Sequence, residues 1–375
     1  VFGFLPTGIN KPLITIQLTL SIILIMSSIL ISKQLNFLLK SDMGYDKNNV
    51  VMVKLKGPGI NPSNIKSFKN ELLQNPMIKT AALSSHIPGE ELSSFHFPVT
   101  KNGEKIRIIA YNIKVDPEYF DLMNMTFLNG QGFNPESNNT NKVLMNQAMM
   151  KKCGFTENIV GKQFNQYKIS GIIKDVHFNS LHTHLKPMAF FSASEVQQGY
   201  MNIRLATSDL RSAMDYIKQS FRNFYPHLPY HYSFLDKTIE KMYETEKKHG
   251  IFLNAFAILS ILIACIGLLG ISITSGKLRI KEIGIRKVNG AKIPQILKLL
   301  NSDFLILIAI DFVIACPIAW YAMKRWLQNF AYKTEISWWI FALAGVIALG
   351  VALLTVSWQS WRAARRNPVE ALRYE

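Results

Sequence analysis

Cysteine is scarce in this chain of 375 residues, which contains only three. Cys265 and Cys316 fall within long apolar runs, which leaves Cys153 alone in the polar part of the chain. A disulfide needs two thiols, so none can form within that polar part. The scarcity therefore excludes a disulfide framework there.

The sequence also lacks a phosphate-binding loop. Such a loop is rich in glycine, follows a strand and ends in Gly-Lys-Ser/Thr. The nearest segment, Gly154 to Lys162, has six residues between its glycines and continues with Gln163. We therefore expect no ATP hydrolysis by this chain and no cofactor bound to it.

Metal-ligating patterns are sparse. His177, His182 and His184 form an H-x4-H-x-H run, but no cysteine or acidic cluster accompanies them. We favour an ordinary surface loop, and a metal site is the alternative interpretation.

Long apolar runs, in contrast, are plentiful. A helix needs roughly 20 residues to cross the ~30 Å hydrocarbon core of a bilayer. Four runs are long enough: Leu13 to Ile31, Ile251 to Ile273, Ile296 to Trp320, and Trp338 to Val356. The sequence therefore predicts four membrane spans, with a long polar stretch between the first two.

Acidic residues are few, 25 against 42 Lys and Arg, so the formal net charge is +17. The basic residues gather at the ends of the apolar runs, as in the tail WRAARRNPVEALRYE. This placement is typical of membrane topology signals and argues against nucleic acid as a partner. The lipid membrane is the expected surrounding.

The short segment from Ser275 to Ile296 sets the orientation. It carries six Lys or Arg against one acid, Glu282, and short basic loops stay in the cytoplasm. On a helical period Leu278, Ile285 and Val288 share one face, which predicts a short amphipathic helix. Asn289 and Gly290 are suited to end it. By alternation, the large polar part lies outside the cytoplasm.

The polar part shows strand and helix signals at both of its ends. Residues 48–55, 62–75 and 77–83 predict a strand-helix-strand unit, and 201–206, 208–224 and 230–235 predict a second. The middle, about 90–198, is expected to be an inserted second lobe, with a hairpin turning at Lys101-Asn102-Gly103. From Asp236 onward, we expect one long helix that continues into the second span.

The predicted fold is an α-helical membrane protein with four transmembrane helices and a large two-lobed α+β domain between the first and second. The boundaries are a cytosolic segment 1–12, a span 13–32, the outer domain 33–250, a span 251–273, the basic loop 274–295, a span 296–322, an outer loop 323–336, a span 337–357 and a cytosolic tail 358–375.

The chain resembles a known family at these same places. KEIGIRKVNGAKIPQILKLLNSDF, PIAWYAMKRWLQNFAYKTEISWW and ALLTVSWQSWRAARRNPVEALRYE are similar to the permease domain of FtsX/MacB-type ABC transporters, the type VII or mechanotransmission class, over residues 251–371. GFTENIVGKQF, SGIIKDVHFNSLH and YSFLDKTIEKMYETEKKHGIF resemble the MacB-like periplasmic core domain. The chain resembles the second half of a two-repeat permease from Bacteroidota.

The resemblance implies a bacterial inner-membrane permease without its own ATPase activity, coupled to a cytosolic ABC ATPase that binds ATP and Mg²⁺. It further implies a second permease half or a homodimer, with a periplasmic adaptor and an outer-membrane factor as further partners. Segment 277–291 would be the coupling helix. Its ATPase-contact residues would be Lys281, Glu282, Gly284, Arg286, Lys287, Gly290 and Ala291. Asn289 departs from the family's usual leucine.

Other residues are singled out by their positions in the spans and the stalk. Asp311 lies near the middle of the third span, where an acid costs about 2.5–3.5 kcal/mol, so it should face other helices. We expect it to serve helix packing, or to form a proton-sensitive hinge. Pro317 should bend the same span because it lacks a backbone N–H. In the stalk the resemblance points to Asp236, Tyr243 and Glu246.

Several functions remain open at this point. Export of peptides or antibiotics, lipoprotein release and control of cell-wall hydrolases are all compatible with the resemblance. From other classes, a receptor with an outer sensing domain and a membrane-tethered binding protein have the same layout. Few residues follow the last span, which argues against a receptor with a cytosolic signalling domain.

Overall fold

A computed structural model describes residues 10–101, 104–137, 139–155, 159–193 and 198–364. The chain divides into two compact units. We call residues 38–244 the outer domain and the described residues of 1–37 and 245–375 the helical unit. The residues at both ends of the chain, 1–9 and 365–375, and the predicted hairpin tip at Asn102-Gly103 lie outside the described residues.

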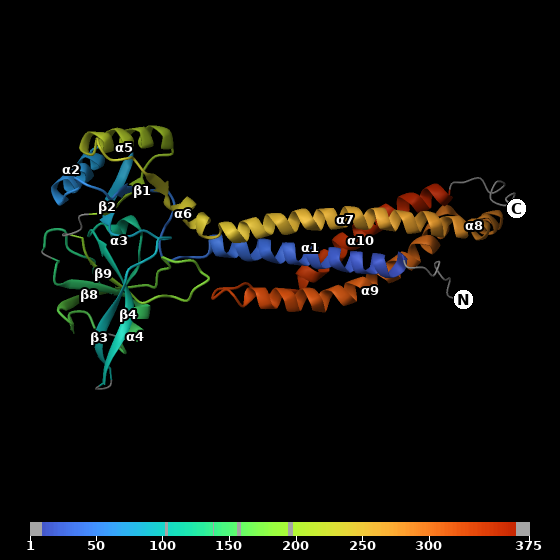
Figure 1. Cartoon of the computed structure of the whole chain (residues 1–375), viewed down its shortest axis with the longest axis horizontal. Helices are drawn as coiled ribbons and strands as arrows, with labels where there is room; N and C mark the ends of the chain where they lie inside the picture. The colour runs from blue at the N-terminus through green and yellow to red at the C-terminus, as the bar shows by residue number, and fades with distance from the viewer. Residues whose placement is uncertain (1–9, 102–103, 138, 156–158, 194–197, 365–375) are drawn as a thin grey trace. The chain divides into compact units, whose positions relative to one another are not determined.

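The helical unit contains four long apolar helices, and this confirms the predicted fold class. They are α1 (Asn10–Lys40), α7 (Glu244–Leu278), α9 (Ile293–Leu327) and α10 (Trp338–Ala364), and they run side by side in Figure 1. By length and composition, all four can cross a membrane. The protein is therefore a multi-pass membrane protein with a large domain outside the spans.

Helix α1 is the most enclosed of the four. Within its apolar window 61% of the residues are buried, against 22–28% in α7, α9 and α10. Small hydroxyl side chains join it to α7: the Ser21 and Ser260 Oγ atoms lie 2.6 Å apart, and Ser28 donates to the Asn254 side chain. Small polar residues suit a helix interface in lipid because they permit close approach and hydrogen bond across it.

The outer end of α1 is tied to the loop between α9 and α10. Lys33 Nζ donates to the Glu335 carbonyl at 2.9 Å, and Gln34 donates to the Tyr332 carbonyl at 2.9 Å. The Gln34 side chain also accepts from the Thr334 N–H at 2.8 Å, although Gln34 is fully buried. The buried Gln34 side chain therefore provides hydrogen-bond partners for backbone groups of the loop, which have no partner within a helix.

The outer domain is built on one mixed sheet of 11 strands. Its strands are β1 (Val50–Leu55), β2 (Ile78–Ser84), β3 (Ser94–Lys101), β4 (Glu104–Val115), β5 (Phe127–Gly130), β6 (Lys142–Asn146), β7 (Gln163–Phe164), β8 (Tyr167–Ile173), β9 (Met188–Ser192), β10 (Gly199–Leu205) and β11 (Tyr232–Phe234). Its helices are α2 (Pro62–Leu73), α3 (Tyr119–Leu122), α4 (Gln147–Lys152), α5 (Leu210–Phe224) and α6 (Leu235–Met242).

The two predicted strand-helix-strand units interleave in the first lobe. The strand order is β11-β1-β10-β2, with every neighbouring pair antiparallel. This is the split arrangement of a ferredoxin-like fold, in which each unit leaves room for a strand of the other. The helix α2 begins where Asn61 accepts from the Asn64 N–H, and α5 where Asp209 accepts from the Ser212 N–H.

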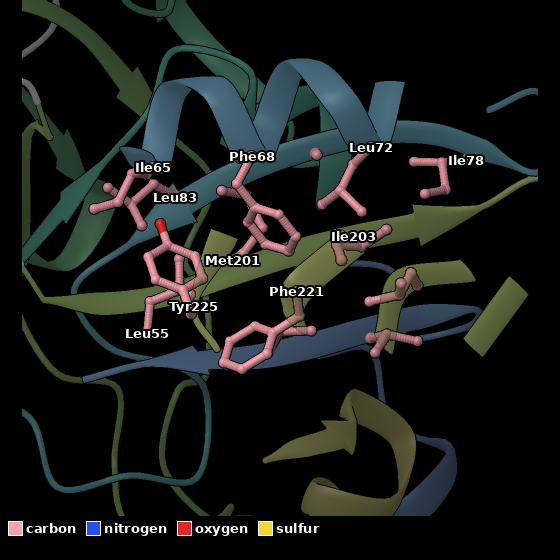
Figure 2. Packing of buried hydrophobic residues seen from close by; sticks show 14 of the residues in the cluster. Leu55, Ile65, Phe68, Leu72, Ile78, Leu83, Met201, Ile203, Phe221 and Tyr225 are labelled. Carbon is pink, nitrogen blue, oxygen red and sulfur yellow. The ribbon is translucent and has the colours of Figure 1, made fainter. Parts of the chain in front are cut away.

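Both helices cover this sheet with their apolar faces. Figure 2 shows Phe68 of α2 pointing toward Phe221 and Tyr225, while Met201 and Ile203 rise from β10. The Phe68 ring meets the Phe221 ring edge to face, with centroids 6.1 Å apart. Aromatic pairs of this geometry add about 0.5–1.5 kcal/mol beyond burial.

The inserted lobe has a separate core. Val143, Met145 and Ile169 are buried there with Cys153 and Phe191. The parts of the sheet that belong to the two lobes meet at β2 and β4, where Ser84 pairs with Val115 and backbone hydrogen bonds join Ser85 to Lys114 and Asp116 to Leu83. The two-lobed prediction is confirmed, but strands β5, β7 and β9 were not predicted, because each is short and none alternates clearly in sequence.

The expectation of one long stalk helix is wrong. The helix α6 ends at Met242, Tyr243 takes φ −112° and ψ 19°, and α7 starts at Glu244. The Tyr243 side chain is completely buried, its hydroxyl accepts from the Leu181 N–H at 3.0 Å, and its ring stacks on His182. These contacts stabilise a turn of the backbone at Tyr243, which a continuous helix could not form.

We predict that Tyr243→Phe loosens this joint. Removing the hydroxyl leaves the buried Leu181 N–H without its acceptor, which costs about 1–3 kcal/mol. Hydrogen exchange at the Leu181 amide should then speed up at least about fivefold, since 1.4 kcal/mol corresponds to a factor of ten.

Tyr216→Phe is the matched control, because the Tyr216 hydroxyl donates to the Glu71 carbonyl far from this joint. It should leave exchange at Leu181 unchanged. Equal exchange in wild type and Tyr243→Phe would contradict the role given to this hydrogen bond.

Candidate functional site

The candidate site is the short helix between the second and third spans. After α7 ends at Leu278, Arg279 links it to α8 (Ile280–Val288), and α9 begins at Ile293. The predicted amphipathic helix is therefore present. It is held between two long helices, one on each side in sequence.

Two contacts fix α8 and its link onto α9. Ile283 is buried in a small apolar cluster with Ile296 and Leu300. The Arg279 guanidinium donates to the Asp303 carboxylate at 2.7 Å, and both side chains are largely shielded, at 15% and 24% exposure. A charge pair in such a setting is stronger than an open surface pair because water screens it less.

The opposite side of α8 is open. Ile285 and Val288 of α8 are 55% and 67% exposed, and Leu278, the last residue of α7, is 65% exposed; we call these three residues together the apolar face of α8. Lys281, Glu282 and Arg286 are exposed beside it. Glu282 and Arg286 lie one turn apart, and their side chains pair at 2.8 Å. The helix thus presents an apolar patch within a mainly basic frame.

The helix stops at a Schellman motif. Gly290 has φ +83°, and the Ala291 N–H reaches back to the Arg286 carbonyl at 2.9 Å. The Asn289 N–H bonds to the Ile285 carbonyl at 3.0 Å. A residue with a Cβ is strained at a φ in this region, so glycine suits the position.

The seven predicted contact residues therefore differ in what they can do. Lys281, Glu282 and Arg286 point outward, whereas Gly284 is buried and Gly290 and Ala291 form the cap. The Lys287 side chain lies outside the described part of the structure. The apolar face was missing from the predicted contacts, although its helical spacing was visible in the sequence. Whether any of these residues touches a partner stays a prediction.

Asp311 and Pro317 lie within α9. Asp311 is completely buried inside the helical unit. Its carboxylate oxygens have no hydrogen-bond partner of good geometry among the described residues, and Thr15 of α1 is a polar neighbour. Pro317 lies inside α9, which continues through it. Their roles in packing stay predictions.

The stalk residues lie at the joint already described. Asp236 is in the first turn of α6, where its carboxylate accepts from the Lys237 N–H at 2.7 Å. Glu246 lies in the first turn of α7. Only Tyr243 is built into the outer domain as a buried anchor. A part in transmission remains a prediction for all three.

The histidine run belongs to a packed loop of the outer domain. Among the described residues, no group of three His, Cys, Asp or Glu side chains is placed to hold a metal. Asp175 accepts from the Ala148 N–H at 2.7 Å in the first turn of α4. Burial lowers the pKa of His177, against the opposing effect of Asp175 and Asp42.

Comparisons with known proteins point to the same part of the chain. Residues 254–368, which include α8, α9, α10 and most of α7, match the model of the FtsX-like permease C-terminal family. The C-terminal part of this chain is thus similar to an FtsX-like permease domain. No curated protein matches.

Solved structures similar to this chain cover about half of it. The periplasmic region of MacB from Actinobacillus actinomycetemcomitans has 13% identity and a TM-score of 0.39, and covers 55% of this chain and 97% of that one. The extracellular domain of the noncanonic ABC-type transporter YknZ from Gram-positive bacteria has 9% identity and a TM-score of 0.35, and covers 49% and 97%. A domain of a putative permease from Porphyromonas gingivalis has 13% identity and a TM-score of 0.34, and covers 50% and 91%.

We predict that Gly290→Ala destabilises the end of α8. A Cβ at Gly290 would meet no atom within 4 Å, so the penalty comes from the backbone alone, about 1–2 kcal/mol. Hydrogen exchange at the Ala291 amide should rise accordingly. Gly350→Ala is the control, because Gly350 also has open space but lies inside a helix, where alanine is favoured. Equal behaviour of the two variants would rule out the strained cap.

A second prediction separates the two aspartates of α9. Asp311→Asn should leave membrane insertion intact and change stability by less than about 0.5 kcal/mol, because asparagine keeps the shape of the side chain and no cation among the described residues pairs with Asp311. Asp303→Asn should cost about 1–3 kcal/mol by weakening the shielded pair with Arg279. Thermal unfolding of the full chain in detergent measures both. Loss of insertion in Asp311→Asn would show that its carboxylate is structural.

Proposed function

We propose that this chain is the permease subunit of an ABC transporter, and that a separate cytosolic ATPase acts on it through α8. The FtsX-like permease domain supports the class, because it contains α8 and the long helices on both sides of it. The proposed location is a bacterial inner membrane, with the outer domain on the periplasmic side.

One observation carries the proposal. The start of α8 is fixed by the Arg279–Asp303 pair, its inner side by the burial of Ile283, and its end by the cap at Gly290. Its apolar face, in contrast, is exposed. An exposed apolar patch held rigidly in a basic frame is typical of a docking surface. A groove in an ATPase subunit would cover the patch and contact Lys281, Glu282 and Arg286.

A membrane surface is the alternative cover for the same helix. Basic residues beside apolar ones also suit anionic lipid. The ATPase is favoured because the helix lies within the matched permease domain. Docking to an ATPase and binding to lipid predict different effects of charge changes, because attraction to lipid depends on the net charge of the helix and docking to a protein depends on the pattern of charges.

The long helix α7 supplies a route from α8 to the outer domain. It is one helix of 35 residues, which corresponds to about 50 Å at 1.5 Å per residue. A displacement of α8 would be carried along α7 to the joint at Tyr243. In this proposal ATP hydrolysis drives work by the outer domain, and nothing needs to pass through the bundle.

The work itself is proposed to be export of peptides or antibiotics. Lipoprotein release and control of cell-wall hydrolases are the alternatives within the class, and a receptor is the alternative outside it. A second permease half or a second copy is the proposed membrane partner, because α7, α9 and α10 leave most of their apolar windows uncovered. A periplasmic adaptor and an outer-membrane factor are further proposed partners.

The prediction for α8 uses the Glu282–Arg286 pair. Exchanging the two charges, Glu282→Arg with Arg286→Glu, keeps a pair one turn apart and keeps the net charge of the helix. The pattern offered to a partner is reversed, so the ATPase should no longer be retained in a pull-down. Retention equal to wild type would remove the docking assignment.

The matched control exchanges a pair away from the helical unit. Lys237 and Glu240 pair at 3.0 Å on the exposed side of α6. The exchange Lys237→Glu with Glu240→Lys should leave ATPase retention unchanged.

The experiment that tests the function is affinity purification of the full-length protein from its native membrane, followed by mass spectrometry. A co-purifying ATPase with a phosphate-binding loop would support the permease class. An adaptor, a lipoprotein carrier or a wall hydrolase would identify the work. Gentle solubilisation that retains other membrane partners but no ATPase would favour the receptor.

A further inference from the structure

An apolar groove lies between α9 and α10 at the end that carries the basic loop. Its volume is about 620 Å³, within the range of roughly 300–1,000 Å³ typical of ligand sites. Its lining is almost entirely apolar, and consists of Leu297, Gly350, Leu353, Leu354, Ser357, Trp358 and Trp361.

The groove exists because the two helices are locked together beneath it. The Asn301 side-chain amide donates to the Ser357 hydroxyl at 2.8 Å, and its Oδ1 accepts from the Ser360 hydroxyl at 3.2 Å. Gly350 contributes no side chain, and a Cβ there would meet no atom within 4 Å. The hollow is therefore a fixed feature of the helix pair.

The open side of the groove is strongly apolar and aromatic. Leu354, Trp358 and Trp361 are 76%, 71% and 42% exposed. Two tryptophans at the end of a span are typical of the boundary between hydrocarbon and headgroups. The groove thus leads from the hydrocarbon region to the headgroup region.

Positive charge gathers at the headgroup end. Lys292 and Lys298 are exposed, one before and one within the first turns of α9. The N-terminus of α9 adds the positive end of its helix dipole. Glu282 and Asp303, the acids nearest in sequence, each pair with an arginine, so they do not neutralise these lysines.

We propose that this groove binds an anionic phospholipid of the cytoplasmic leaflet. One acyl chain lies along Leu297, Leu353 and Leu354, and the phosphate lies toward Lys298 and the N-terminal end of α9. A second copy of the chain fits less well, because a symmetric contact would bring the same lysines against each other. The leaflet follows from the side assigned to the basic loop, and the proposal does not depend on the ATPase.

Tryptophan fluorescence tests the proposal in the full chain. Trp320, Trp326, Trp338 and Trp339 are replaced by Phe, so that Trp358 and Trp361 remain out of six. The protein is placed in phosphatidylcholine nanodiscs that contain either dibrominated phosphatidylglycerol or dibrominated phosphatidylcholine as quencher. One basic residue is worth about a fivefold preference, so half-maximal quenching should need at least about fivefold less of the anionic lipid.

Three variants examine the parts of the site. Lys298→Gln should lower the preference for the anionic lipid about fivefold. Gly350→Phe should fill the groove and abolish the preference, whereas Gly270→Phe, at an equally open helix glycine outside the groove, should keep it.

Two results would overturn the proposal. Equal quenching by the two brominated lipids would mean that only ordinary boundary lipid lies there. Absence of quenching by either lipid would mean that protein covers the groove, as a second copy would.

Discussion

The hydrocarbon interior of a membrane offers a peptide group no hydrogen-bond partner, and this constraint shapes the helical unit. Its four long helices satisfy their own backbones, so only side chains join them. Several polar side chains inside pair across helices, as Ser21 does with Ser260 and Asn301 with Ser357, whereas the buried Asp311 has no such partner among the described residues. Irregular backbone is confined to the segments between helices, where Gln34 or the cap at Gly290 provides the missing partners.

The same constraint leaves irregular backbone at the two ends of α7. At one end α8 is fixed on α9 but open on its outer face. At the other, Tyr243 turns the chain into α6 while its buried side chain ties the joint to the loop at Leu181 and His182.

The outer domain consists of two lobes, and each lobe has a hydrophobic core of its own. The first lobe interleaves strands that are distant in sequence, so its core closes only when both ends of the domain are folded. The second lobe packs a core of its own, and the two parts of the sheet are joined only by the short contact of β2 with β4 around Ser84 and Val115 among the described strands. Few backbone hydrogen bonds therefore link the sheets of the lobes, whereas each sheet is extensively bonded within itself.

The sequence by itself determined the features that depend on local pattern. Apolar runs of sufficient length predicted the four spans, periodicity predicted α2, α5 and α8, and Asn289-Gly290 marked where α8 ends. The tertiary structure alone decided that β10 lies between β1 and β2, that Tyr243 interrupts the stalk, and that Ile283 turns inward while Ile285 stays exposed. It also decided the Arg279–Asp303 pair and the groove beside Gly350. Each of these depends on partners distant in sequence, and a local pattern of hydrophobicity and charge does not specify which distant partner a residue meets.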